Sequence, residues 1–151
     1  MFEQKQLEVD PGLVEEIVKL YRDLDHARGG KHGTWHSRRM RSNSFTWFNN
    51  TFNNIAAVVG DFKIDEWWFN CGEPGDEYRW HAHPPYPLVG VLYIQTPENS
   101  GGIEFRRQGE YQIFQPAAGN FLLFPGNLVH RVLKNNSTDF RISAAFNFKK
   151  R

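Results

Sequence analysis

The sequence predicts an α+β protein that is mainly β: a β-sandwich of the jelly-roll or double-stranded β-helix kind, cupin-like, with N-terminal helices packed on one sheet. Two observations support this fold class. Residues 10–30 and 47–61 carry apolar residues at helical spacing. From about Asp61 onward, short aromatic and β-branched runs alternate with Gly, Pro and Asn. Regularly spaced short strands of this kind are typical of antiparallel sandwiches and barrels.

The chain has the size of one domain. Its 151 residues, of which 40% are hydrophobic, are enough to bury about two-thirds of the unfolded surface. No linker and no internal repeat divides them. We therefore expect a single domain over residues 1–151, in which residues 1–60 give helical support and residues 61–148 form the β core.

The helices are expected in two segments. In the first, DPGLVEEIVKLYRDLDHARGG, Asp10 is a suitable N-cap, Pro11 suits the first helical position, and the pair Gly29–Gly30 ends the helix. The second, WFNNTFNNIAAVVGD, has its apolar residues at helical spacing. The strands are expected at residues 62–71, 77–83, 88–96, 101–107, 120–126, 128–134 and 140–148.

Charge, hydropathy and cysteine content exclude several classes of protein. Lys and Arg number 18 against 17 Asp and Glu, so no global field favours nucleic acid or a membrane surface. No stretch reaches the roughly 20 apolar residues that cross a bilayer, and the N-terminus does not resemble a secretion signal. The single cysteine, Cys71, excludes an internal disulfide framework and is expected to be a small buried side chain. We therefore expect a cytoplasmic protein.

A pair of histidines lies in the motif Trp80-His81-Ala82-His83-Pro84-Pro85. Residues two apart on a strand point to the same side, so His81 and His83 would face one point. Two such imidazoles are a ready pair of ligands for iron, zinc, copper or nickel. The two prolines end the strand and place the pair at the mouth of the sandwich. The alternative is two surface histidines beside a turn.

A third histidine and an arginine complete the pattern. His130 opens the strand that follows the Pro125–Gly126 turn, and a sandwich can bring it beside the first pair. Further on, Arg141 and Ser143 share one face of an otherwise apolar strand. A buried guanidinium is costly unless an anion meets it, and its planar fork matches a carboxylate. The alternative is a structural salt bridge to one of the chain's own carboxylates.

At these residues the sequence resembles the 2-oxoglutarate and iron(II)-dependent oxygenases, particularly a prolyl-hydroxylase-like subgroup of bacteria and their viruses. The family pattern is H-x-D/E, then a distal His, then Arg in an R-x-S context, which corresponds here to His81–His83, His130 and Arg141–Ser143. The strand that carries Tyr93 and the segment at 101–105 also resemble family strands. The resemblance covers about residues 61–148.

The resemblance implies an enzyme that uses Fe(II), 2-oxoglutarate and O2, most commonly as a hydroxylase. It implies metal ligands and co-substrate contacts, with no catalytic residue beyond the metal ligands: His81, His83 and His130 for iron, and Arg141, Ser143 and Tyr93 for the distal carboxylate. Position 83 departs from the family, which mostly has Asp or Glu there. We favour a three-histidine site, with Asp76 or Glu73 as the alternative third ligand.

Two other classes of protein compete with this interpretation. A cupin-type metal protein, dioxygenase or isomerase without 2-oxoglutarate also uses H-x-H, but residues 84–89 lack the Glu that its first motif requires. A non-catalytic module could bind nucleic acid through a basic cluster interleaved with tryptophans, although such a run is more often a solvated loop. Its residues are Lys31, Arg38, Arg39, Arg41, Trp35 and Trp47.

Substrate choice is expected to lie in the loops at residues 28–46, 72–79 and 107–118, and a peptide or small molecule is the expected substrate. The pattern specifies neither its identity nor the oligomeric state. Of the neighbouring residues Trp67 and Trp68, one should enter the core and the other should line a pocket or the surface. His26, His32 and His36 lack paired spacing and are expected at the surface.

Overall fold

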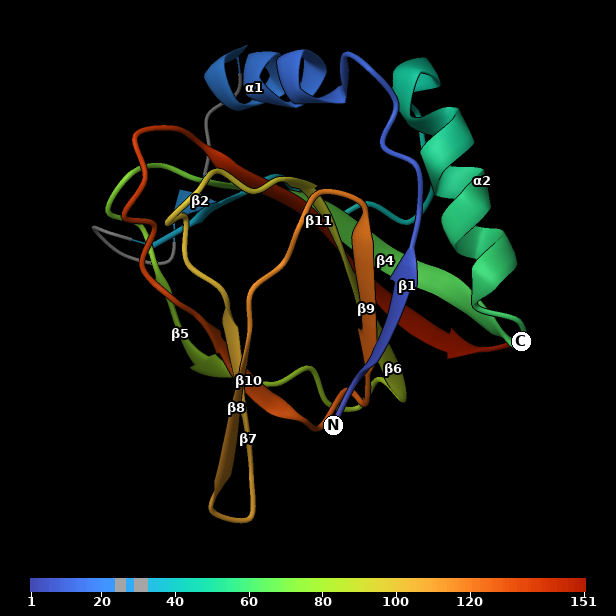
Figure 1. Cartoon of the computed structure of the whole chain (residues 1–151). Helices are drawn as coiled ribbons and strands as arrows, with labels where there is room; N and C mark the ends of the chain where they lie inside the picture. The colour runs from blue at the N-terminus through green and yellow to red at the C-terminus, as the bar shows by residue number, and fades with distance from the viewer. Residues whose placement is uncertain (24–26, 29–32) are drawn as a thin grey trace.

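Two antiparallel β-sheets face each other across the molecule, as the computed structural model shows for residues 1–23, 27–28 and 33–151 (Figure 1). The large sheet has the order β1-β9-β6-β11-β4-β3-β2, and the small sheet has the order β5-β10-β7-β8. The large sheet comprises β1 (Glu3–Gln6), β2 (Ala27–Arg28), β3 (Trp35–His36), β4 (Phe62–Gly72), β6 (Leu88–Gln95), β9 (Asn120–Phe124) and β11 (Arg141–Lys150). The small sheet comprises β5 (Tyr78–His81), β7 (Ile103–Arg107), β8 (Glu110–Phe114) and β10 (Val129–Val132). The predicted mainly β, double-stranded β-helix class is confirmed.

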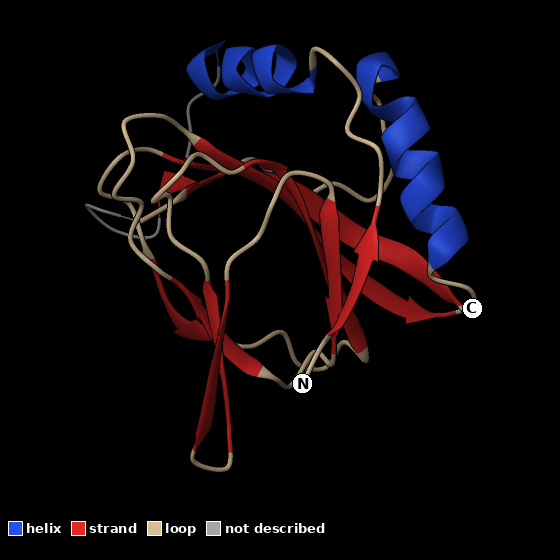
Figure 2. Ribbon diagram, viewed as in Figure 1, coloured by secondary structure: helices blue, strands red, loops and turns tan. Residues whose placement is uncertain are grey.

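Two helices cover the outer face of the large sheet (Figure 2). They are α1 (Leu13–Asp23) and α2 (Asn49–Val58), the latter preceded by the short 3-10 helix η1 (Thr46–Phe48). Their buried residues, among them Ile17 and Ile55, pack against the aromatic side chains of β4 and β11. None of the described helices is long and apolar enough to cross a membrane.

The described residues form two hydrophobic clusters, one on each side of the large sheet. The larger lies between this sheet and the helices, and it includes the fully buried Trp67, Phe69 and Phe146. The smaller lies between the two sheets and is built on Phe105, Phe124 and their neighbours. Because the large sheet is covered on both faces, β11 is buried along most of its length and β4 is mostly buried in its second half.

The first helix differs from its prediction at both ends. It begins at Leu13, because Gly12 adopts a φ of 91° and forms a turn with Asp10 and Pro11. The Asp10 carboxylate accepts a hydrogen bond from Asn50 Nδ2 at 3.2 Å rather than capping the helix. Beyond the helix, residues 27–28 are the strand β2 and are not helical. The expected glycine stop at residues 29–30 lies outside the described residues.

The structure also has strands that the sequence did not predict. β1 and β3 lie within the N-terminal 60 residues, and β8 lies inside the expected loop at 107–118. β1 pairs with β9 along Glu3–Gln6 and is mostly exposed, and β8 is exposed along nearly its whole length. Such edge strands bury little apolar surface, so their sequences carry no clear alternation of apolar and polar residues.

Candidate functional site

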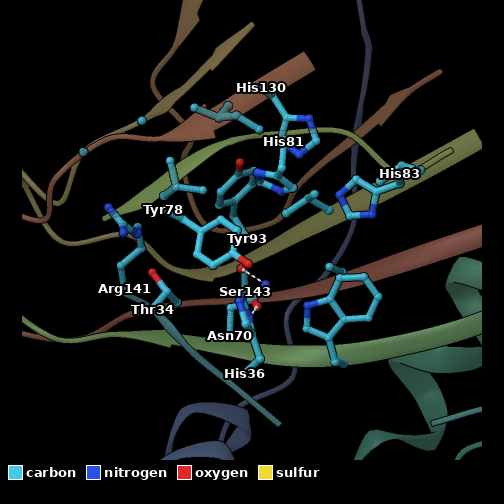
Figure 3. A pocket seen from close by; sticks show the side chains of 18 of the residues that line it. Thr34, His36, Asn70, Tyr78, His81, His83, Tyr93, His130, Arg141 and Ser143 are labelled. Carbon is cyan, nitrogen blue, oxygen red and sulfur yellow. Dashed lines mark hydrogen bonds between the residues drawn. The ribbon is translucent and has the colours of Figure 1, made fainter. Parts of the chain in front are cut away.

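Three histidines converge between the two sheets. His81 ends β5, His130 lies on β10 directly opposite it, and His83 follows two residues after β5 (Figure 3). One ligand nitrogen from each ring lies within 4.8 Å of the other two. Among the described residues this is the group of side chains that could hold a metal ion. The structure therefore brings together the three histidines that the sequence singled out.

Two of these rings have a fixed tautomer. His81 Nδ1 lies 2.8 Å from the backbone oxygen of Arg79, and His130 Nδ1 lies 3.0 Å from that of Leu128. A carbonyl oxygen only accepts hydrogen bonds, so each Nδ1 must carry the proton. The Nε2 of each ring then keeps its lone pair, which is the form that binds a metal.

His83 is held differently. β5 ends at His81, so His83 is not on the strand as predicted, and the backbone N–H of His83 instead donates to the oxygen of Gly126 at 2.7 Å. Its ring lies parallel to Trp68, with 5.9 Å between centroids and 10° between planes. Position 126 has to be glycine, because an added Cβ would lie 1.9 Å from the oxygen of Tyr86. The turn after β9 thus fixes where His83 enters the site.

The surroundings keep all three rings neutral. Burial, together with the neighbouring His81, lowers the pKa of His83 to about 4 and that of His130 to about 3. Burial also lowers the pKa of His81. Neutral imidazoles are the metal-binding form of histidine. At neutral pH the cluster is therefore ready to accept a cation.

The two carboxylates proposed as alternative ligands lie elsewhere. The Asp76 carboxylate accepts a hydrogen bond from the backbone N–H of Glu73 at 2.8 Å, which closes the turn between β4 and β5. Neither side chain lines the cavity that holds the histidines. The geometry therefore favours His83 as the third ligand over Asp76 or Glu73.

The histidines border a cavity of about 140 Å³ between the sheets. Figure 3 shows Arg141 and Thr34 across this cavity from His83. Val89, Val91 and other apolar side chains line it together with the polar residues. Sequence reasoning found Arg141 but missed Thr34, whose buried hydroxyl has no hydrogen-bond partner within the described part of the chain.

Arg141 is a buried cation at the start of strand β11. Its guanidinium donates to the backbone oxygens of Ser100 and Leu133, the latter at 2.7 Å. No carboxylate among the described residues forms an ion pair with it, so within that part of the chain the structural salt bridge considered above has no candidate partner. Burial lowers the pKa of Arg141 to about 10, while the nearby charge of Asp76 acts in the opposite direction. Arg141 therefore keeps its positive charge at neutral pH.

A chain of hydrogen bonds orients the Ser143 hydroxyl. Asn70 Nδ2 donates to Ser143 Oγ at 3.1 Å, and Asn70 Oδ1 lies 2.5 Å from His36 Nδ1. Because Ser143 Oγ accepts from Asn70, its own proton is available to a ligand in the cavity. His36 was predicted at the surface, and this was wrong: strand β3 carries it to the cavity wall, where it is half-buried. His26 and His32 lie outside the described residues.

Tyr93 lies on β6 and lines the same cavity. Burial raises the pKa of Tyr93, so the phenol stays protonated and can donate a hydrogen bond.

Cys71 is fully buried, and burial raises the pKa of its thiol to about 12, which fits the expected inert side chain. Trp67 lies in the core and Trp68 lines the cavity, as expected for this pair.

Several described members of the basic cluster are engaged within the protein. Trp35 is 1% exposed and belongs to the core, so it cannot stack on a base. Arg39 is paired with Glu66 at 2.6 Å and Arg41 with Asp65 at 2.9 Å. Lys31 lies outside the described residues. These contacts leave little support for the non-catalytic binding module.

The chain matches one protein family over more than half of its length. The model of the family described as "Putative 2OG-Fe(II) oxygenase" matches residues 66–147, which include all three histidines and Arg141. The chain belongs to this family. The protein is therefore a 2-oxoglutarate-dependent Fe(II) oxygenase, an enzyme that uses Fe(II), 2-oxoglutarate and O2, as the sequence resemblance implied. The match does not support the cupin-type alternative without 2-oxoglutarate.

Solved structures share the fold of this oxygenase at low sequence identity. A prolyl-4-hydroxylase from Pseudomonas putida is 17% identical with a TM-score of 0.74, over 99% of this chain and 92% of that chain. The viral collagen prolyl hydroxylase of Paramecium Bursaria Chlorella virus-1 is 11% identical with a TM-score of 0.71, over 99% and 96%. HygX from Streptomyces hygroscopicus, solved with nickel and 2-oxoglutarate, is 14% identical with a TM-score of 0.71, over 99% and 82%. Among curated proteins, none matches this sequence.

Proposed function

We propose that this oxygenase is a hydroxylase of a peptide or small-molecule substrate. In this proposal His81, His83 and His130 hold the iron, and Arg141, Ser143 and Tyr93 hold the distal carboxylate of 2-oxoglutarate. The observation that carries the assignment is the shared cavity: three neutral imidazoles border it together with a buried cation that has no carboxylate partner among the described residues.

The donor set fits a divalent transition metal. Imidazole nitrogens suit iron, and the rings of His81 and His130 keep Nε2 free. Three neutral ligands supply no negative charge, so the charge of the metal must be offset by anionic ligands from outside the protein. We therefore expect the metal to be held more weakly when 2-oxoglutarate is absent.

The opposite side of the cavity fits a carboxylate. Arg141 supplies a positive charge, and the hydroxyls of Ser143 and Tyr93 can each donate a hydrogen bond. A buried cation without a directly paired carboxylate is costly, and a bound dicarboxylate would offset that cost. The hydroxyl of Thr34, unpartnered within the described residues, would gain a partner at the same end.

In the working enzyme, iron and 2-oxoglutarate together supply the activation of O2 and the oxidation of the substrate. The protein positions these groups and excludes water. Val89, Val91 and Ile103 give the cavity an apolar wall, and the neutral rings of the histidines leave their lone pairs available. Arg141 and Ser143 orient the co-substrate from the far side.

The size of the cavity supports a substrate that approaches at its mouth. About 140 Å³ is small beside the roughly 300–1,000 Å³ of pockets that enclose drug-sized ligands. Once a dicarboxylate is bound, a peptide side chain or a small molecule can reach the metal only from outside. Two of the structurally similar proteins are prolyl hydroxylases, which is consistent with a peptide substrate.

The buried, single Cys71 supports a reducing, cytoplasmic setting.

The first experiment adds Fe(II) and 2-oxoglutarate to the metal-free protein without oxygen and records the visible spectrum. A metal-to-ligand charge-transfer band is expected, and Arg141→Ala should weaken or abolish it. Arg131→Ala is the matched control, because Arg131 is paired with Glu104 by an ion pair of 2.7 Å and does not line the cavity. If the metal binds and no band appears at saturating 2-oxoglutarate, the assignment of the co-substrate site is wrong.

The substrate class is tested separately by succinate release. Proline-containing peptides and small hydroxylatable metabolites are offered in turn, with oxygen, Fe(II) and 2-oxoglutarate present. Product mass then distinguishes hydroxylation, a gain of one oxygen atom, from desaturation. Turnover without oxygen insertion would contradict the hydroxylase proposal while leaving the oxygenase family assignment intact.

A further inference from the structure

The three histidines differ in what holds their rings. His81 and His130 each donate Nδ1–H to the backbone oxygen of the residue two positions earlier. Within the described part of the chain, no such hydrogen bond of ordinary geometry ties either ring nitrogen of His83. A metal-binding imidazole generally needs a hydrogen-bond acceptor on its other nitrogen to fix its tautomer and orientation. His83 therefore requires an acceptor that its own loop does not supply.

Asn147 offers such an acceptor. It lies on β11, on the same face as Ser143, and is 1% exposed. Its Nδ2 donates to Glu66 Oε1 at 2.9 Å, which commits the amide and turns Oδ1 the other way. Oδ1 has no partner of hydrogen-bond geometry within the described residues. The strand register pairs Asn147 with Glu66, two residues from the Trp68 that lies parallel to the His83 ring. A buried carbonyl oxygen without a partner is rare and costly.

The amide belongs to a closed set of contacts around His83. Glu66 also accepts a hydrogen bond from Arg39 at 2.6 Å, and the Arg39 guanidinium lies over Trp68, 4.3 Å from the ring centroid. Trp68 in turn lies parallel to the His83 ring. The same carboxylate that fixes Asn147 thus also fixes the aromatic surface on the face of His83. Asn147, Glu66, Arg39 and Trp68 are not themselves proposed metal ligands.

We propose that Asn147, anchored by Glu66, is the positioning residue for His83, and that its Oδ1 accepts the N–H of the His83 ring so that the other nitrogen faces the metal. The inference rests on the proposed role of His83 as a ligand. The negative Glu66 polarises the amide and makes Oδ1 a stronger acceptor. Glu66 thus acts through the Asn147 amide to support His83, which occupies the position where the family mostly has an Asp or Glu ligand.

The test measures Ni(II) affinity of the metal-free protein by calorimetry. Asn147→Ala should weaken binding about 10- to 100-fold, the usual effect of removing the partner of a metal-binding histidine. Asn120→Ala is the matched control: Asn120 is also a buried asparagine of the large sheet, bonded to Ala117 N–H and Gln6 Oε1, and does not line the cavity. It should lower stability without changing the affinity of the folded protein.

A second pair of measurements separates positioning from general damage. The double variant Asn147→Asp with Glu66→Gln exchanges carboxylate and amide and keeps an acceptor beside His83, so it should recover most of the lost affinity. Nitrogen-15 shifts of the imidazoles in the metal-free protein should show one tautomer for His83 in the wild type and a mixture in Asn147→Ala. A single tautomer in both proteins would overturn the proposal.

His83→Ala distinguishes failure of this inference from failure of the proposed site. If His83→Ala leaves Ni(II) affinity unchanged, His83 is not a ligand and the proposed metal site itself is wrong. If His83→Ala weakens binding while Asn147→Ala does not, only the positioning role of Asn147 is rejected.

Discussion

The two faces of strand β11 divide stability from function. On the face toward the helices, Ile142, Ala144 and Phe146 are fully buried in the larger hydrophobic cluster. On the face toward the small sheet, Arg141 and Ser143 line the cavity. Apolar packing is non-directional, so the first face depends mainly on volume, whereas each polar group on the second face needs a particular partner. Neighbouring residues on one strand thus obey different physical rules.

The largest expected effect on stability is that of Phe146→Ala, on the apolar face. The ring of Phe146 is fully buried and stacks on Trp67 with centroids 5.7 Å apart. Its removal leaves a cavity, and we expect the free energy of unfolding to fall by about 3–5 kcal/mol. Urea denaturation measures this loss. The folded fraction should bind Ni(II) with unchanged affinity, and a large loss of affinity would show that the two faces are not independent.

The opposite face is tested by Arg141→Gln in the Ni(II)-loaded protein. Loss of the charged donor should weaken 2-oxoglutarate binding by about 1.5–3 kcal/mol, or about 10- to 150-fold. Calorimetric titration measures the affinity. Arg131→Gln serves as the control, because that guanidinium lies on β10 with its ion pair to Glu104. Equal affinities in wild type and Arg141→Gln would remove the basis for the co-substrate site.

The histidines predict how pH affects the metal-free protein. The pKa values of about 3 for His130 and about 4 for His83 lie below the ordinary 6.5, so above pH 7 these rings are neutral in both folded and unfolded chains. As pH falls below 6.5, the unfolded chain takes up protons that the folded one does not. Stability should then decrease, by at most about 1.4 kcal/mol per pH unit for each histidine.

Urea denaturation between pH 7.5 and 5 measures this slope. A His130→Asn variant lacks one of the buried titrating rings and should show a shallower dependence on pH. An identical slope in the variant would mean that other groups cause the loss of stability at low pH.

The smallest expected effect belongs to Ser143→Ala. Its hydroxyl accepts from Asn70, and the variant removes one proposed donor to 2-oxoglutarate. Affinity for 2-oxoglutarate should fall by about 1 kcal/mol, roughly fivefold, with the charge of Arg141 retained. Calorimetric titration of the Ni(II)-loaded variant with 2-oxoglutarate measures this affinity. An effect as large as that of Arg141→Gln would place the serine, rather than the guanidinium, at the centre of the co-substrate site.

The central strands and the proposed site were accessible from the sequence because their signals are local. Strands β4 and β11 combine aromatic and β-branched residues over many positions, and the alternation around Arg141 distinguishes its two faces. The short strands β1, β3 and β8 gave no such signal. These strands pair with their neighbours through backbone hydrogen bonds. Such bonds form with any side chain, so they leave no pattern in the sequence.

The sequence by itself determined the fold class, the three histidines and the polar face of β11, since each follows from residue type and spacing along one segment. Only the tertiary structure decided what surrounds them. It carried His36 and Thr34 to the cavity, placed the Asp76 carboxylate in a turn, tied Asn147 to Glu66, and laid Trp68 parallel to His83. These outcomes depend on contacts between residues far apart in the chain, which register and sheet packing create and no local pattern encodes.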